Sequence, residues 1–228
     1  MKVPAIIFSR MGSSRLPGKA LRHIAGEPLI KRVIDRVSKV KNLSTIVVAT
    51  SNSKTDDRLT QYIQSLNIEV FRGATHDVLN RAVSCASYLG VDKFVRINGD
   101  SPLIDPELLE KGIEMWREPN LDLISNVFPR TYPVGTSVEI IKTDSLKKIL
   151  SLTVDSCDRE HVTRFFYRNP EKFRILNFES GRSELREVRL AVDTEEDLER
   201  IDWLFKEFGG LINFEMAAEK SSLWSSVE

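Results

Sequence analysis

The loop after the first apolar segment combines glycine, hydroxyl groups and fixed positive charge. Residues 10–19 read Arg-Met-Gly-Ser-Ser-Arg-Leu-Pro-Gly-Lys and directly follow the apolar residues 3–9. Glycine lets main-chain N–H groups approach an anion closely, and Arg and Lys side chains neutralise phosphate charge. The loop therefore predicts a polyphosphate site. Its expected donors are Arg10, Gly12, Ser13, Ser14, Arg15 and Lys19.

Neither common phosphate-binding motif fits this loop. A Walker A loop has four residues between its glycines and a Ser or Thr after its Lys. Here five residues separate Gly12 from Gly18, and Ala20 follows Lys19. The Gly-x-Gly of a dinucleotide-binding turn is also missing from this loop. The alternative is a basic, flexible surface loop, but residues 1–26 contain five cations and no Asp or Glu, which favours the phosphate site.

Two aspartates are candidate ligands for a divalent cation on the phosphates. Mg²⁺ on a nucleotide is usually held by one or two carboxylates together with phosphate oxygens and water. Asp100 lies in the turn Asn98-Gly99-Asp100 after an apolar segment, where a simple β-turn is an equally good interpretation. Asp193 ends an apolar segment before a helical pattern, so spacing alone favours a helix cap there.

Strand and helix patterns alternate through the first half of the chain. This alternation predicts βαβ units and a mainly parallel sheet covered by helices on both faces, an α/β fold. Ligands of such sheets bind beyond the carboxyl ends of the strands, where loops 10–19, 73–77 and 98–105 are expected. The expected strands are 3–9, 45–49, 69–72 and 93–97, and the expected helices are 28–40, 59–66, 78–86 and 105–116.

The second half of the chain has a more mixed pattern. No linker or repeat interrupts it, so we expect a single domain over residues 1–220 and a loose tail over 221–228. The expected strands are 121–125, 137–141, 173–178 and 188–192, and the expected helices are 146–152, 159–167 and 194–208.

Composition excludes several classes of protein. Hydrophobic residues make up 41% of the 228 residues, as in ordinary globular proteins. Thirty-three basic residues balance 33 acidic ones, which argues against a general nucleic-acid or anionic-membrane binder. We find neither a signal peptide nor an apolar run of membrane-spanning length. Cys85 and Cys157 form no Cys-x-x-Cys motif and are expected to be reduced, which predicts a cytoplasmic protein.

Four segments, in order along the chain, resemble the cytidylyltransferase (CMP-sugar synthetase) superfamily, especially its SpsF-type spore-coat polysaccharide proteins. They are the phosphate loop, Asn98-Gly-Asp-Ser-Pro-Leu-Ile, Asp158-Arg-Glu-His-Val-Thr and Leu190-Ala-Val-Asp-Thr-Glu-Glu-Asp-Leu. The similarity runs from about residue 3 to residue 204. It implies a three-layer, GT-A-like (Rossmann-like) nucleotidyltransferase fold with a mainly parallel central sheet. It also implies a homodimer.

The resemblance implies a reaction as well. A sugar hydroxyl, usually of a 2-keto-3-deoxy acid, attacks the α-phosphate of CTP, and pyrophosphate leaves. The product is a CMP-sugar for surface polysaccharide. By the same resemblance Asp100 and Asp193 hold Mg²⁺, and Arg10 lies near the triphosphate. Arg15, Lys19 and Asp100 become the expected catalytic residues, because phosphoryl transfer needs positioning and charge neutralisation more than covalent chemistry.

The remaining expected contacts also come from the resemblance. The other residues expected at the nucleotide are Arg72, Gly73, Asp77 and Asn98, and those expected at the sugar are Arg130, Tyr132, Glu139, Arg159, Glu160 and His161. Asp77 is alternatively a cap of the helix expected at 78–86. Val134 and Ser137 replace two aspartates that the family usually carries over the sugar, which leaves the acceptor open. The alternatives are another NTP, a phosphorylated or phosphonate acceptor, or a GT-A glycosyltransferase, whose usual Asp-x-Asp is missing here.

Overall fold

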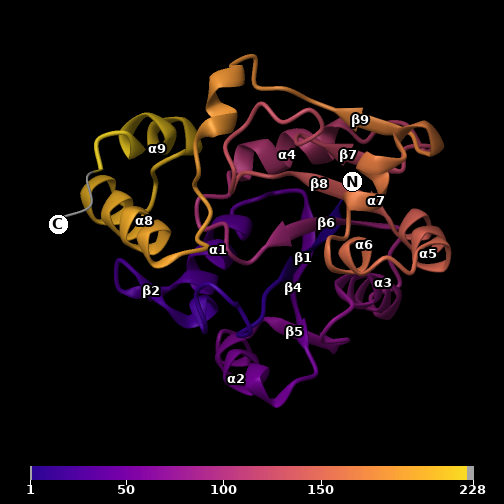
Figure 1. The fold of residues 1–228 in the computed structure, drawn as a ribbon, viewed down its shortest axis with the longest axis horizontal. Helices are drawn as coiled ribbons and strands as arrows, with labels where there is room; N and C mark the ends of the chain where they lie inside the picture. Colours follow the sequence, from indigo (N-terminus) through magenta and orange to yellow (C-terminus); the bar gives the residue numbers. More distant parts are fainter. Residues whose placement is uncertain (1, 225–228) are drawn as a thin grey trace.

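The computed structural model describes residues 2–224, which form helices packed on both faces of a central sheet (Figure 1). Within these residues the sheet has seven strands, and all except β8 run parallel to one another. The mainly parallel sheet predicted from the sequence is therefore confirmed. Its spatial order is β5 (Glu69–Gly73), β4 (Leu43–Ser51), β1 (Val3–Phe8), β6 (Lys93–Asn98), β8 (Glu139–Lys142), β7 (Leu123–Ser125) and β9 (Ile175–Asn177).

Alternating side chains of the strands supply two separate hydrophobic cores. In β1, Ala5 and Ile7 pack on one face of the sheet, and Ile6 and Phe8 pack on the other. The first face is covered by α1 (Leu29–Val37), α2 (Asp57–Ser65), α4 (Pro106–Met115), α8 (Glu195–Phe208) and α9 (Phe214–Ser221). The second is covered by α3 (Val78–Tyr88), α5 (Thr143–Leu152) and α7 (Arg164–Arg168), and α6 (Ser156–Glu160) packs against α3 and α7. The predicted three-layer architecture is thus confirmed.

Short elements complete the fold. A small antiparallel ribbon, β2 (His23–Ile24) with β3 (Glu27–Pro28), precedes α1. The 3₁₀ helices are η1 (Lys19–Leu21), η2 (Lys54–Asp56), η3 (Pro170–Lys172) and η4 (Ser183–Glu187). No helix of the part of the chain that the structure describes is long and apolar enough to cross a membrane.

The carboxyl ends of β1 and β6 meet at one edge of the sheet, where Phe8 lies opposite Asn98. The next residue, Gly99, lets the two loops touch, because a Cβ there would stand 2.7 Å from Cβ of Ser9 and 2.9 Å from the carbonyl oxygen of Phe8. Real Cβ atoms essentially never approach other heavy atoms that closely. The loops that follow β1 and β6 are thereby held side by side, as predicted for the ligand-binding edge.

Two predicted elements differ in the structure. Residues 188–192 are not a strand. They make only an isolated bridge, in which Val134 N–H donates to Val188 O at 2.9 Å and Leu190 N–H donates to Val134 O at 2.6 Å. The expected helix over 159–167 is two short helices with a break between Glu160 and Arg164. That break lets Val162 and Phe166 stay in the core while Glu160 faces another direction.

The end of the chain contains a helix that the sequence pattern did not indicate. Helix α9 packs against α8 and buries Phe214, Ala217 and Ala218. The expected loose tail, 221–228, begins at the last residue of α9, and its residues 225–228 lie outside the described residues.

Candidate active site

A polar cleft of about 320 Å³ lies at the carboxyl ends of β1 and β6. It is bounded by the phosphate loop, by α3 and by the residues around the end of α6. The structure brings eleven of the predicted site residues together in its lining. They are Arg10, Gly12, Ser13, Ser14, Arg15, Lys19, Asn98, Asp100, Glu160, His161 and Asp193.

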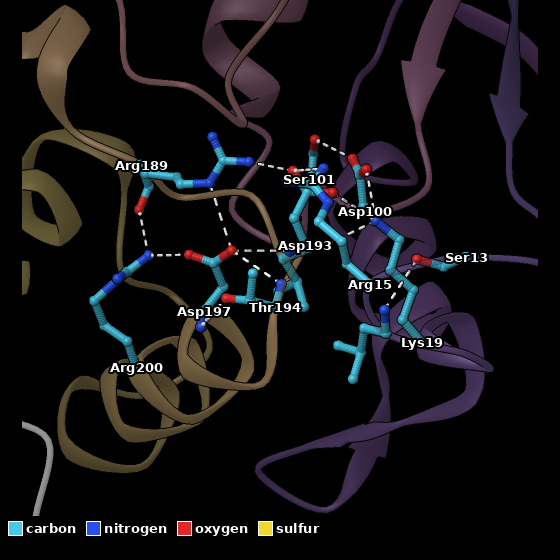
Figure 2. A network of polar contacts seen from close by, with 12 residues as sticks. Ser13, Arg15, Lys19, Asp100, Ser101, Arg189, Asp193, Thr194, Asp197 and Arg200 are labelled. Carbon is cyan, nitrogen blue, oxygen red and sulfur yellow. Dashed lines mark hydrogen bonds and ion pairs between the residues drawn. The ribbon is translucent and has the colours of Figure 1, made fainter. Parts of the chain in front are cut away.

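In the lining of this cleft, the Lys19 ammonium lies among three oxygen atoms (Figure 2). Its Nζ is 3.0 Å from Asp100 Oδ2, 2.9 Å from Asp193 Oδ1 and 2.8 Å from the carbonyl oxygen of Val192. A main-chain bond joins the same segments, since Val192 N–H donates to Asp100 O at 2.9 Å. Two carboxylates that are far apart in the sequence therefore meet the phosphate loop at one point.

Asp193 is held in its ionised form by the cations around it. Burial opposes ionisation, but the hydrogen bond and charge of Lys19, with Arg15 and Arg189, outweigh it and keep the pKa of Asp193 below its ordinary value. Arg15 lies 3.2 Å from Asp193 Oδ2, and Arg189 also donates to that oxygen. The helix cap that spacing favoured at Asp193 is wrong, because Thr194 caps α8 through a capping box with Asp197.

The oxygen atoms around Lys19 suit a divalent cation. Two carboxylates and one carbonyl already surround a positive charge there, and Mg²⁺ needs few protein ligands when phosphate oxygens and water complete its shell. Among residues 2–224, no group of three or more His, Cys, Asp and Glu side chains gathers in a way that could hold a metal. Asp100 and Asp193 therefore fit a metal that arrives with a phosphate ligand.

The phosphate loop is held by a buried carboxylate that the sequence did not single out. Asp56, 1% exposed, accepts a 2.7 Å hydrogen bond from Met11 N–H and further bonds from Thr50 and Ser51. Met11 O in turn accepts from Gly18 N–H at 2.9 Å, and Gly18 adopts a left-handed φ of +72°. In the described part of the chain, the N–H groups of Gly12, Ser14 and Arg15 donate to no protein group, so they are available to an anion.

Replacing Asp56 with Asn should loosen this loop. One amide oxygen cannot accept all the bonds that two carboxylate oxygens accept, and an unsatisfied buried donor costs about 1–3 kcal/mol. We expect a lower melting temperature and about tenfold weaker binding of inorganic triphosphate, measured by thermal unfolding and calorimetric titration. The exposed Asp144→Asn variant is the control. Native triphosphate affinity in a destabilised Asp56→Asn protein would show that the Asp56 contact with the loop does not serve anion binding.

A family model described as "Cytidylyltransferase" matches residues 4–221. The chain belongs to this cytidylyltransferase family. It is 32% identical over 210 residues to the spore coat polysaccharide biosynthesis protein SpsF of Bacillus subtilis, covering 90% of this chain and 86% of the relative. It is 31% identical over 191 residues to a 3-deoxy-manno-octulosonate cytidylyltransferase of Geobacter metallireducens, covering 82% of this chain and 67% of the relative. The resemblance seen in the four sequence segments is confirmed.

A solved structure of a cytidylyltransferase from Leptospira borgpetersenii superimposes on the chain with a TM-score of 0.91. The two share 28% sequence identity, and the match covers 98% of this chain and 94% of the other. This similarity confirms the predicted nucleotidyltransferase fold.

Three residues expected at the nucleotide lie outside the cleft of this cytidylyltransferase. Arg72 pairs with Asp57 at 2.7 Å, and Gly73 packs against Phe71 and Arg81. Asp77 caps α3 by accepting from Asn80 N–H at 2.8 Å, and also pairs with Arg159. A role of these three residues in contact with the nucleotide stays a prediction.

Most residues expected at the sugar also point elsewhere. Arg130 donates to Pro133 O and to Ser137 Oγ, and Tyr132 packs against Phe214 and donates to Glu179 O. Glu139 and Arg159 do not line the cleft either. Glu139 is buried and pairs with Arg96, and Arg159 joins Asp77 at 2.8 Å and the carbonyl groups of Leu150 and Thr153. Glu160 and His161 do line the cleft, and Glu160 pairs with Arg10 at 2.8 Å.

Two cleft arginines of the cytidylyltransferase were not predicted from the sequence. Arg96 precedes Asn98 by two residues on β6, so both side chains leave the strand on the same face. Arg81 follows Asp77 by one helical turn on α3. Strand and helix periodicity could have pointed to both residues once Asn98 and Asp77 were candidates.

Removing Lys19 should open the carboxylate pair to a metal. The Lys19 ammonium and a divalent cation compete for the same oxygens, so Lys19→Met should bind Mn²⁺ without nucleotide about tenfold more tightly than the native protein. The same variant should bind CTP more weakly, because it lacks the ammonium group that would donate hydrogen bonds to the phosphates. Electron paramagnetic resonance of free Mn²⁺ measures the first effect, with the exposed Lys147→Met as control. Equal Mn²⁺ affinity in the Lys19→Met and native proteins would contradict the competition.

Proposed function

We propose that the protein, with Mg²⁺, transfers CMP from CTP to an acidic sugar of the 2-keto-3-deoxy type and releases pyrophosphate. The CMP-sugar product would serve surface polysaccharide synthesis. The observation that carries this proposal is the convergence of Lys19, Asp100 and Asp193 at the phosphate loop. Membership of the cytidylyltransferase family and the similarity to SpsF and to a 3-deoxy-manno-octulosonate cytidylyltransferase support it. The cytoplasmic location and the homodimer stay predictions.

The residues of the loop would bind and orient the triphosphate. Gly12, Ser14 and Arg15 line the cleft, and a polyanion could accept from their N–H groups without breaking a protein hydrogen bond of residues 2–224. Held by Asp100 and Asp193, Mg²⁺ would neutralise phosphate charge. The sugar hydroxyl oxygen forms a bond to the α-phosphorus and loses its proton to water, while the bond from the α-phosphorus to the bridging β-phosphate oxygen breaks. Lys19 and Arg15 offset the charge that builds on the leaving pyrophosphate.

The test is pyrophosphate release with each of the four common NTPs, Mg²⁺ and a panel of sugars. The panel pairs acidic 2-keto-3-deoxy sugars with neutral and phosphorylated sugars. The proposal expects release with CTP and an acidic sugar, and a loss of release when EDTA removes the metal. Release with another NTP but not with CTP would refute CTP as the nucleotide substrate. Release only with phosphorylated sugars would refute an acidic sugar as the acceptor.

A further inference from the structure

The buried carboxylate of Asp197 makes more contacts than a helix cap needs. Asp197 lies in the first turn of α8 and is 4% exposed. In a capping box, a side chain at this position has only to accept from the N–H of the capping residue, here Thr194. Asp197 accepts from that N–H at 3.1 Å, and its further contacts lead to Asp193 (Figure 2).

Asp197 reaches Asp193 by two routes. Asp197 Oδ2 accepts directly from the main-chain N–H of Asp193 at 3.0 Å. The same oxygen lies 3.5 Å from Nε of Arg189, and Nη2 of Arg189 donates to Asp193 Oδ2. One carboxylate therefore holds the main chain of Asp193 and also the guanidinium group that contacts the Asp193 side chain.

The second oxygen of Asp197 is held by Arg200. Nη2 of Arg200 donates to Asp197 Oδ1 at 2.7 Å and to the carbonyl oxygen of Arg189 at 3.1 Å. The side chains of Arg200 and Asp197 are 15% and 6% exposed, so solvent ions screen this pair little. Both oxygens of Asp197 thus have partners, which leaves the carboxylate little freedom to rotate.

Asp193 lacks the support from the sheet that Asp100 has. Asp100 lies just after β6, which is paired with β1 and β8. Asp193 instead follows residues 188–192, which make only an isolated bridge. Val192 N–H donates to Asp100 O, but within residues 2–224 the Asp193 N–H donates only to Asp197. The Asp197 contact therefore supplies at this point the support that strand pairing supplies before Asp100.

Support of this kind matters for a residue that holds a metal. Residues that hydrogen-bond a metal ligand fix its orientation, and replacing them commonly changes metal affinity by about 10–100-fold. Asp197 is not among the residues that line the cleft, whereas Asp193 is. An effect of Asp197 on a bound metal would therefore pass through Asp193.

We propose that Asp197 is a positioning residue, which holds Asp193 where its carboxylate can bind the metal of a metal–nucleotide complex. The inference rests on the proposed function, which supplies the metal and CTP. Arg200 keeps Asp197 in place, and Arg189 links Asp197 to the Asp193 side chain. A carboxylate that served only as a cap of α8 would affect the stability of the fold but not the binding of the metal.

The experiment compares nucleotide binding by the full chain with and without a metal. Calorimetry measures the affinity for the α,β-methylene analogue of CTP, which cannot transfer CMP, in Mn²⁺ or in EDTA. Mn²⁺ should strengthen binding to the native protein. Asp197→Asn should reduce this gain by about tenfold, because an amide group has only one oxygen to accept hydrogen bonds. The affinity in EDTA should stay within about twofold, since Asp197 does not line the cleft.

Two control variants separate positioning from charge and from capping. Glu196→Gln removes one negative charge from an exposed residue in the same turn of α8. Thr194→Ala removes the hydroxyl that accepts from Asp197 N–H but keeps the Asp197 carboxylate, so it should lower the melting temperature. Both variants should keep the gain from Mn²⁺ within about twofold of the native value.

Arg200→Met decides the question if the Asp197→Asn protein does not fold. It removes the partner of Asp197 Oδ1 and should reduce the gain from Mn²⁺ by a smaller factor. The inference is overturned if the folded Asp197→Asn protein keeps the native gain, or if the two controls lose as much of it. It is also overturned if Asp197→Asn does not fold and Arg200→Met keeps the gain. If Mn²⁺ does not strengthen binding to the native protein, the metal of the proposed function fails, and this inference with it.

Discussion

Replacing Asp100 with Asn should reduce CMP transfer by about a thousandfold or more while leaving the fold intact. Asp100 Oδ2 contacts Lys19 at 3.0 Å and, with Asp193, forms the pair that fits Mg²⁺. An amide keeps the shape of the side chain but removes one of the two negative charges that would hold the metal. Pyrophosphate release at saturating CTP measures the effect, and circular dichroism checks the fold.

The matched control for this prediction is Asp144→Asn, which changes an exposed carboxylate on α5. It should leave activity unchanged. Asp193→Asn should behave like Asp100→Asn, because both oxygens share the same ammonium. If the folded Asp100→Asn protein kept activity within about tenfold of the native protein, the proposal that Asp100 holds the metal would be contradicted.

Gly135→Ala should destabilise the folded protein by about 3 kcal/mol or more. Gly135 has a φ of +105°, and a Cβ there would lie 2.6 Å from the main-chain nitrogen of Ala191 and from the carbonyl carbon of Leu190. Main-chain atoms cannot move aside as a flexible side chain can. The melting temperature of a domain of this size should fall by about 10 °C, measured by calorimetry.

Gly181→Ala separates the strain of a left-handed φ from the steric contact. Gly181 has a φ of +75°, but no atom lies within 4 Å of an added Cβ. That variant should cost only about 1 kcal/mol, which is the strain of the conformation alone. Equal melting temperatures for the two variants would mean that the segment around Leu190 adjusts easily. Gly135→Ala should also reduce activity, since the displaced segment leads directly to Asp193.

The strands and helices of the first half could be predicted because their patterns are local. Continuous apolar runs such as β1, and caps such as Asp105 before Pro106, mark elements without reference to the rest of the chain. Residues 188–192 could not be placed in this way. Their apolar character is real, since Leu190, Ala191 and Val192 are all buried, but the facing loop offers only an isolated bridge. Strand formation depends on that partner, which the sequence does not reveal.

The residues of the candidate site also fall into those that carry a local sequence signal and those that do not. Loop residues such as Arg15 and Lys19 carry a local signal of glycine and positive charge, and the structure places them in the cleft. Arg81 and Arg96 carry no such local signal of their own, and only their spacing from Asp77 and Asn98 relates them to this cavity. Asp56 acts through a main-chain contact with Met11 that no sequence pattern predicts.

The bond from Val192 N–H to Asp100 O ties the two carboxylate-bearing segments together through the main chain. Such a tether is independent of which side chains stand at positions 100, 192 and 193. The distance between the main-chain segments that carry Asp100 and Asp193 should therefore survive substitution of these side chains. The two charges can then be removed one at a time while the main chain keeps its arrangement.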